Sequence, residues 1–292
     1  MCLAETLDHK HTHDQNDGHD HVRSGRGRVG RRRFLLGGGA AAAGVALTGA
    51  SSLPAAAHGG HGHRRRGRVV DLTHRLVRDF PTFTHDQPRD ETVADYAADG
   101  FYAKRWTLNE HTGTHIDTPG HFSEGMRLVD QLEADELLAP IVVIDIRRRA
   151  LDDPNAMVEP DDLVRFERRH GRIPHGALVC MDSGWAAKAG DPLAFLGGPA
   201  FPDYNFPGFS IEATDWLVAR RNPVGIGVDT VSLDPGNSTS FDVHVGFLGS
   251  DHYGVEGLTN LDGIPPRGAH AFVGPIPWED GSGSPCRVVA SW

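Results

Sequence analysis

Apolar residues along this 292-residue chain gather into short runs, and most of these runs predict strands. The runs at 140–146 and 176–185 are apolar at almost every position, as in strands that are buried on both faces. Residues 102–108 alternate between apolar and polar, which is typical of a half-buried strand that here leads into a histidine cluster. In total, the pattern predicts strands that start at Val69 and cover residues 102–108, 140–146, 176–185, 223–234, 268–277 and 285–292.

Three other segments predict helices. Residues 129–140 place apolar side chains at helical spacing and predict a short helix that ends before Pro140. Residues 159–173 have a proline near the start, acidic residues in the first turn and a glycine at the end. Residues 210–221 begin with Ser210, a good N-cap. The strands and helices alternate without a Gly/Ser linker or a repeat, so we predict one α/β domain over 69–292.

Residues 1–57 have the features of a targeting segment. The stretch GRRRFLLGG at 30–38 resembles the twin-arginine export motif. The apolar run at 34–47 is too short to predict a stable membrane span, and three alanines before His58 offer a cleavage site. We therefore predict export by the twin-arginine route to the extracellular or periplasmic/cell-wall space, with 58–68 as a flexible basic arm. A bilayer anchor or a disordered arm is the alternative, and whether the segment is cleaved stays open.

Composition narrows the classes of partner. The chain has 29 Lys and Arg against 39 Asp and Glu, so its formal charge of −10 argues against a nucleic-acid partner. Five of its 18 histidines lie in the leader before the arginines, in a polar tract that cannot form a core. The body keeps only Cys180 and Cys286, and their spacing does not say whether they pair.

The stretch HTGTHIDTPGH at 111–121 is the densest group of metal-ligand residue types in the body. Its three histidines and its aspartate all have odd numbers, so an extended strand would place them on one face. A straight strand would nevertheless separate His111 from His115 by roughly 13 Å, too far for one ion. We therefore expect either a bend at Gly113 or two ions side by side, which Asp117 could bridge. A polar loop of hydrogen-bonded histidines is the alternative.

The same stretch resembles the H-x-G-T-H-x-D-x-P-x-H motif of the cyclase family of metal-dependent hydrolases, which includes bacterial kynurenine formamidase and isatin hydrolase. Other segments resemble the family in the same order, and these are VVDLTHRL, VVIDI, DSGW, FPGFS, GIGVDTVSLDPG and GSGSPCRVV. The resemblance covers nearly the whole body. It implies a single swivelling β/β/α-type domain with a mixed central sheet or barrel flanked by helices, and a homo-oligomer.

The resemblance also implies roles for individual residues. It predicts that the metal ligands are His111, His115, Asp117, His244 and Glu256. It makes His121 the catalytic acid/base rather than a ligand. His252 competes with His244 as a ligand, but we interpret it as a loop or pocket residue because the family spacing to Glu256 is twelve residues. Imidazole and carboxylate ligands without thiolate suit one or two ions of Zn²⁺ or Mn²⁺.

The resemblance implies a hydrolase that uses metal-activated water to cleave a carbon–nitrogen bond in a small aromatic amide or lactam. The reaction first expected is that of an arylformamidase in tryptophan catabolism, which converts N-formyl-kynurenine to kynurenine and formate. The alternatives are an isatin, lactam or lactone hydrolase, a polyketide-type cyclase or dehydratase, and a binding protein without turnover. Three aromatic residues and one histidine are candidate substrate contacts, with core packing as the alternative, and they are Tyr102, Trp106, Trp185 and His252.

Overall fold

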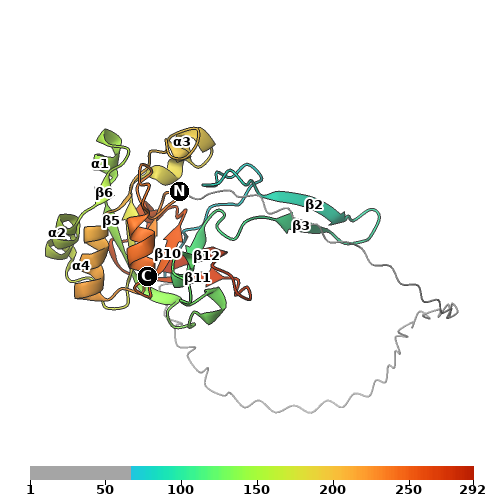
Figure 1. The fold of residues 1–292 in the computed structure, drawn as a ribbon. Helices are drawn as coiled ribbons and strands as arrows, with labels where there is room; N and C mark the ends of the chain where they lie inside the picture. The colour runs from blue at the N-terminus through green and yellow to red at the C-terminus, as the bar shows by residue number, and fades with distance from the viewer. Residues whose placement is uncertain (1–66) are drawn as a thin grey trace, which may run out of the picture. The chain divides into compact units, whose positions relative to one another are not determined.

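The computed structural model describes residues 67–292. The predicted leader at 1–57 and most of the predicted basic arm at 58–68 lie outside the described residues and stay predictions. The described part is an α/β domain in which a closed mixed barrel of strands is flanked by helices, as predicted (Figure 1). Within it, no helix combines the length and the apolar character that a membrane crossing requires.

Seven strands form the barrel. Their order is β12, β11, β5, β7, β9, β10 and β4, and β4 closes the ring by pairing with β12. The strands β5, β7, β9 and β10 run parallel, whereas every pairing of β4, β11 and β12 is antiparallel. Their bounds are β4 His115–Asp117, β5 Leu138–Asp145, β7 Leu178–Asp182, β9 Gly225–Val228, β10 Tyr253–Glu256, β11 Arg267–Pro275 and β12 Gly283–Ser291. The first strand, β1 (Val69–Asp71), pairs with the end of β12.

The apolar runs of β5 and β7 are continuous because both faces of these strands are buried. In β5, Ile141 and Val143 belong to the cluster that fills the barrel, whereas Val142 and Ile144 belong to a second cluster outside it. The second cluster includes apolar side chains from α2 (Pro160–His170) and α4 (Ile211–Arg221). The barrel therefore has one apolar core inside and another between its wall and these two helices.

The predicted helices at 159–173 and 210–221 are confirmed as α2 and α4. Pro160 occupies the first turn of α2, and Gly171 ends it with a φ of 88° that favours glycine. The Ser210 hydroxyl accepts a hydrogen bond of 3.2 Å from the Ala213 amide at the start of α4. The remaining short elements are α1 Arg147–Asp152, α3 Pro192–Leu196, β6 Met157–Val158 and β8 Gly208–Phe209, together with the single turns η1 Pro119–His121, η2 Val129–Gln131, η3 Trp185–Lys188, η4 His244–Leu248 and η5 Leu261–Gly263.

The predicted helix at 129–140 is wrong. Only η2 forms there, and β5 begins at Leu138. The Leu137 carbonyl accepts a hydrogen bond of 2.9 Å from the Val273 amide, so the segment is drawn into pairing with β11. Val129, Leu132 and Leu137 all pack against the core inside the barrel, which explains their apolar character without a helix. Tertiary pairing has overridden helical spacing here.

The strand predicted at 102–108 is confirmed as β3 (Ala103–Thr107). It forms an antiparallel hairpin with β2 (Arg89–Ala94), a strand that the apolar pattern did not reveal because it is mostly polar. Figure 1 shows this hairpin extending away from the barrel. The closing pair predicted at 268–277 and 285–292 is confirmed as β11 and β12. Cys180 and Cys286 are both buried, and neither is in a disulfide.

Candidate metal centre

The candidate centre lies on the outer face of the barrel where β4 pairs with β10. Ile116 of β4 and Val255 of β10 point into the barrel core. Because side chains alternate along a strand, His115, Asp117 and Glu256 point to the opposite face. Glu256 is directly opposite His115 in the register, so both carboxylates and the imidazole are brought together by strand pairing alone.

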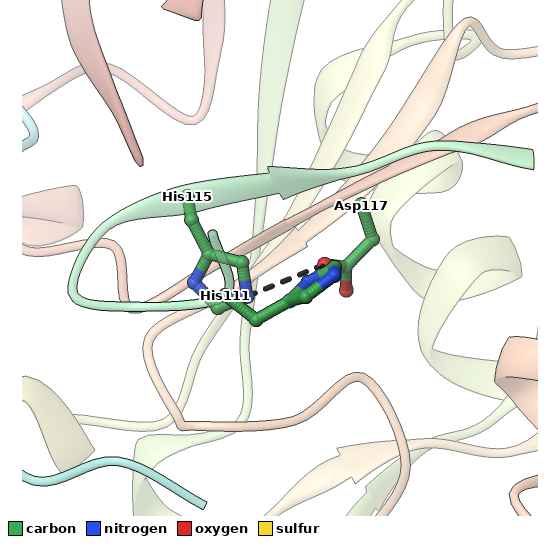
Figure 2. A group of neighbouring side chains, drawn as sticks. All are labelled: His111, His115 and Asp117. Carbon is green, nitrogen blue, oxygen red and sulfur yellow. Dashed lines mark hydrogen bonds and ion pairs between the residues drawn. The ribbon is translucent and has the colours of Figure 1, made fainter. Parts of the chain in front are cut away.

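The bend predicted at Gly113 is confirmed. Gly113 has a φ of 72°, and the chain turns back so that His111 Nδ1 lies 2.6 Å from Asp117 Oδ1 (Figure 2). The ring centroids of His111 and His115 are 5.4 Å apart. A second glycine makes room for this return, because a β-carbon on Gly283 of β12 would lie 2.5 Å from His111 Cε1. The bend in the backbone therefore brings His111 and His115 closer together than a straight strand would allow.

The His115 ring is oriented by the same bend. Its Nδ1 lies 3.0 Å from the Gly113 carbonyl oxygen, to which it can donate. In this orientation Nε2 faces Asp117 Oδ1 and Glu256 Oε2, each 3.3 Å away. A histidine held in this way through one nitrogen presents the other as a metal ligand.

His244 completes the group from a distant part of the chain. It is the first residue of η4, and its Nδ1 lies 2.6 Å from Asp234 Oδ2. Its Nε2 faces Glu256 Oε1 at 3.2 Å and Asp117 Oδ2 at 3.6 Å. The Leu233 amide donates to Glu256 Oε1 over 2.9 Å and fixes that carboxylate. The carboxylate–histidine pair of Asp234 and His244 is a common support for a metal ligand.

Asp117 is the point at which the two parts of the centre meet. Its Oδ1 faces His111 and His115, whereas its Oδ2 faces His244. Asp117 and Glu256 are only 1% and 4% exposed, and two buried carboxylates require positive charge nearby. Three imidazoles and two carboxylates match the ligands of Zn²⁺ or Mn²⁺, so this donor set fits one or two divalent ions.

The pKa shifts show how strongly the site favours positive charge. Burial disfavours the charged ring of His115, but Asp117 and Glu256 outweigh it and raise the pKa of His115 to about 10. Burial likewise opposes charge on His244, yet its carboxylate neighbours raise the pKa of His244 well above the usual value. Burial acts to raise the pKa of Asp117, but the histidines hold it well below its usual range. The electrostatics therefore suit a cation between the carboxylates.

His121 lies beside this group. It ends η1, and its ring stacks on His111 with centroids 3.9 Å apart and an interplanar angle of 24°. Burial lowers the pKa of His121 to about 4, with the opposing effect of Asp117 too small to reverse it. Among the hydrogen bonds of the described residues, none involves the His121 ring. His121 thus offers a neutral imidazole at the edge of the site.

Sequence reasoning missed the residues that support the ligands. Asp234 orients His244, and the Ser282 hydroxyl lies 2.9 Å from His111 Nε2 while it donates to Glu110. Both Asp234 and Ser282 fall in segments that already resemble the family, GIGVDTVSLDPG and GSGSPCRVV. The signal that could have identified Asp234 is an acidic residue near the end of a predicted strand, but its partner is visible only in the fold.

The four candidate substrate contacts lie apart from these six residues. Tyr102 and Trp106 are exposed on or beside the hairpin strand β3, and Tyr102 stacks on Tyr96. Trp185 is buried and donates to the Phe195 carbonyl over 2.7 Å. His252 Nδ1 lies 2.9 Å from the Ser250 hydroxyl. Within residues 67–292, no hydrogen bond, ion pair or ring contact joins any of the four to the metal-type group, so their role in substrate binding stays a prediction.

Comparison with known proteins identifies the family to which this chain belongs. The profile of the family described as "Putative cyclase" matches residues 70–235, which include the whole 111–121 stretch and Asp234. The chain belongs to the cyclase family. His244 and Glu256 lie beyond the matched residues, so their place in this cyclase-family site rests on the structure and on the motif spacing.

Relatives with established names share most of this cyclase-family domain. The isatin hydrolase of Roseibium aggregatum is 32% identical over 222 residues, which cover 72% of this chain and 84% of that protein. The kynurenine formamidase of Salinibacter ruber is 27% identical over 182 residues, 62% of this chain and 76% of that protein. A crystal structure of an isatin hydrolase bound to the product analogue thioisatinate is 29% identical, has a TM-score of 0.74, and covers 77% of this chain and 92% of that chain.

Proposed function

We propose that this cyclase-family protein is a metal-dependent hydrolase of a carbon–nitrogen bond in a small aromatic amide. The observation that carries the proposal is the clustering of five metal-type donors around Asp117, with the His121 imidazole beside them. The donors are His111, His115, Asp117, His244 and Glu256, and the imidazole is His121. The donor atoms of His121, Asp117 and His244 lie within 4.8 Å of one another, which places the His121 imidazole where it can act on a group bound at the centre.

The chain's own residues divide the work of such a reaction. A divalent ion held by the five donors would supply Lewis acidity, which polarises a carbonyl and acidifies water. His121 lies against the donors with its ring nitrogens free, so it can take a proton from water and return it to the leaving nitrogen. The water oxygen bonds to the carbonyl carbon, the carbon–nitrogen bond breaks, and a carboxylate and an amine result. Asp234 and the Gly113 carbonyl keep two of the ligand imidazoles aimed at the same point.

Two aromatic amides are candidate substrates. A cyclic amide of the isatin type is supported by the 32% identity with isatin hydrolase and by the relative that binds thioisatinate. N-formyl-kynurenine, the substrate first expected, is supported by the formamidase at 27% identity. We rank the cyclic amide first because both the identity and the coverage are larger.

The test is hydrolysis by the metal-loaded protein in water enriched in ¹⁸O. Isatin, N-formyl-kynurenine and a benzo-fused lactone would be offered in parallel, with a chelator-treated sample as the control. We expect isatin to be opened with one ¹⁸O incorporated in the new carboxylate, and chelation to abolish the reaction. Cyclisation or dehydration without ¹⁸O, or turnover of the lactone alone, would contradict the proposal.

We also propose that the protein is exported, because Arg31 and Arg32 precede an apolar run as in twin-arginine signals. Replacing both with lysine should retain the protein inside the cell, and the same fraction exported from the double variant would contradict this. The homo-oligomer implied by the family resemblance remains a proposal that sedimentation of the purified protein would test.

A further inference from the structure

Glu110 is an acidic residue next to the metal-type centre that has no place among its five donors. It directly precedes His111 in the sequence, and its side chain is 34% exposed. The Ser282 hydroxyl connects the two residues, because it donates to Glu110 Oε1 and lies 2.9 Å from His111 Nε2. A carboxylate, a hydroxyl and an imidazole therefore form a chain that ends on the ring nitrogen of His111 that does not face Asp117.

Ser282 is held by the motif stretch and its neighbour at every one of its polar atoms. Its amide donates to Glu110 Oε1 over 3.2 Å. Its carbonyl oxygen accepts from the Thr118 amide at 3.0 Å and from the Thr118 hydroxyl at 2.8 Å. Because both backbone groups of Ser282 are fixed, its hydroxyl is brought to a defined place between Glu110 and His111.

Two glycines allow this close approach. A β-carbon on Gly281 would lie 3.2 Å from Glu110 Oε2, and a β-carbon on Gly283 would lie 2.5 Å from His111 Cε1. Side chains at these two positions would therefore press on the carboxylate or on the imidazole ring. The sequence Gly-Ser-Gly at 281–283 thus presents a single hydroxyl to Glu110 and His111.

This chain of hydrogen bonds has a direction. A carboxylate can only accept, so the hydroxyl proton of Ser282 points at Glu110. The hydroxyl oxygen then accepts from His111, whose Nε2 must carry a proton. A neutral imidazole has one ring proton, so its lone pair is on Nδ1, the nitrogen that lies 2.6 Å from Asp117 Oδ1. A lone pair and a carboxylate oxygen repel each other at that distance, and a cation bound by both removes the repulsion.

We propose that Glu110 is a positioning residue that acts through Ser282 to keep the proton of His111 on Nε2, and so makes Nδ1 the metal-binding atom. This inference rests on the metal centre of the proposed function. It gives His111 the kind of support that Asp234 gives to His244, with one hydroxyl between the charge and the ring. Such outer partners orient a ligand imidazole and raise its basicity. The effect of Glu110 should be weaker than that of Asp234, because its charge is farther from the ring.

The test observes the His111 ring directly, by ¹⁵N NMR of the protein loaded with diamagnetic Zn²⁺. We expect a metal-bound Nδ1 and a protonated Nε2 whose proton exchanges slowly with water in the parent. In Ser282→Ala and in Glu110→Gln that proton should exchange faster. Zn²⁺ affinity, measured in a competing chelator, should fall about tenfold in each, the lower end of the range for outer partners of a ligand. The exposed positions Glu279→Gln and Ser291→Ala are the matched controls and should leave both measurements unchanged.

The double variant of Glu110→Gln and Ser282→Ala shows whether the two residues act as one unit. If Glu110 acts through Ser282, the double variant should bind Zn²⁺ no more weakly than Ser282→Ala alone. Additive losses would overturn the inference, because the two residues would then support the site separately. Zinc bound through Nε2 of His111 in the parent would also overturn it, and this measurement requires no variant to fold.

The outcomes also separate this inference from the proposed function. A parent that hydrolyses isatin but binds Zn²⁺ through Nε2 of His111 would reject the role of Glu110 and keep the hydrolase. A parent that binds Zn²⁺ through Nδ1, with the coupled loss of affinity in the variants, but hydrolyses no amide would uphold the role of Glu110 and reject the amide hydrolase. A parent that binds no Zn²⁺ at His111 would overturn the inference together with the metal centre.

Discussion

The two parts of the metal-type centre are built differently. His111, His115 and Asp117 come from seven consecutive residues, and a glycine bend and one short strand bring them together. His244 and Glu256 come from a π-type turn and a parallel strand that are far away in the sequence. We call these the motif part and the distal part. The first is specified by local backbone conformation, and the second depends on closure of the barrel.

The supports of the two parts differ in the same way. The motif part is held by a backbone carbonyl, that of Gly113, and by the hydroxyl of Ser282. The distal part is held by a buried carboxylate, Asp234, which accepts hydrogen bonds from the His244 ring and from two backbone amides. A charged support contributes more to ligand basicity than a neutral one. The distal part should therefore be the more sensitive to loss of its support.

The largest effect is expected at the residue that both parts share. Asp117→Asn removes the charge that faces His111, His115 and His244 together. Metal content should fall to near zero, and hydrolysis of isatin should fall by about a thousandfold or more because the Lewis acid is lost. Asp203→Asn, at an exposed turn, is the control for a generic Asp-to-Asn change. Full metal content in Asp117→Asn would show that Asp117 is not a metal ligand.

The second effect tests the distal part alone. Asp234→Asn keeps the shape of the side chain but removes the charge behind His244. Metal affinity should fall about 10- to 100-fold, as is usual for loss of a carboxylate behind a ligand histidine. Titration of the apo protein with Zn²⁺ in a competing chelator measures it. If two ions bind, only one of the two binding steps should move; an unchanged isotherm would show that Asp234 does not support a metal ligand.

The third effect tests the motif part through its packing. A β-carbon in Gly283→Ala would lie 2.5 Å from His111 Cε1 and 2.7 Å from the Ile116 carbonyl oxygen. The His111 ring must then move, and we expect weaker metal binding together with a loss of about 1–3 kcal/mol in the free energy of unfolding. Gly263→Ala is the matched control, since its nearest contact is an ordinary 3.7 Å from Val70 Cγ1. Equal behaviour of the two variants in denaturant melts and metal titrations would contradict the close approach.

The smallest effect concerns the bend itself. Gly113→Ala places a β-carbon at a φ of 72°, which should cost about 1–2 kcal/mol in the free energy of unfolding. Gly190→Ala lies in open space at an ordinary φ and should be nearly neutral. Urea denaturation of both variants measures the difference. A Gly113→Ala protein as stable as Gly190→Ala would mean that the left-handed bend does not persist in solution.

The sequence predicted the parts of the fold whose pattern is local. Two buried strands, β5 and β7, were predicted because strands that are buried on both faces have continuous apolar runs. Two helices, α2 and α4, were predicted because the residues that begin or end a helix lie next to it in the sequence. The helix predicted at 129–140 was wrong because the apolar residues of this segment pack against the barrel interior from turns rather than from a helix. The polar strand β2 has no apolar alternation, so only its pairing with β3 reveals it.

In the candidate site, too, the features that depend on neighbouring residues could be predicted and those that depend on distant contacts could not. The distance between His111 and His115 on a straight strand required either a bend or two ions, and the structure has the bend at Gly113. The distal residues His244 and Glu256 came from family spacing, not from any pattern in the residues themselves. Ser282 and Gly283 were missed because each acts through a contact with His111, which is remote in the sequence, and Asp234 was missed because only the fold brings its carboxylate to the His244 ring. Long-range contacts of this kind depend on tertiary packing, which no local window of sequence contains.

Five residues are proposed to hold metal and His121 to move protons, and one paired measurement tests this division of roles. Metal content and isatin hydrolysis are measured on the same preparations of the parent and of His121→Ala. We predict that His121→Ala retains the parent's metal content while its turnover falls about 10²- to 10⁴-fold, the usual contribution of a general acid/base. A variant that hydrolyses isatin as fast as the parent, or one that loses its metal together with its activity, would contradict the division of roles.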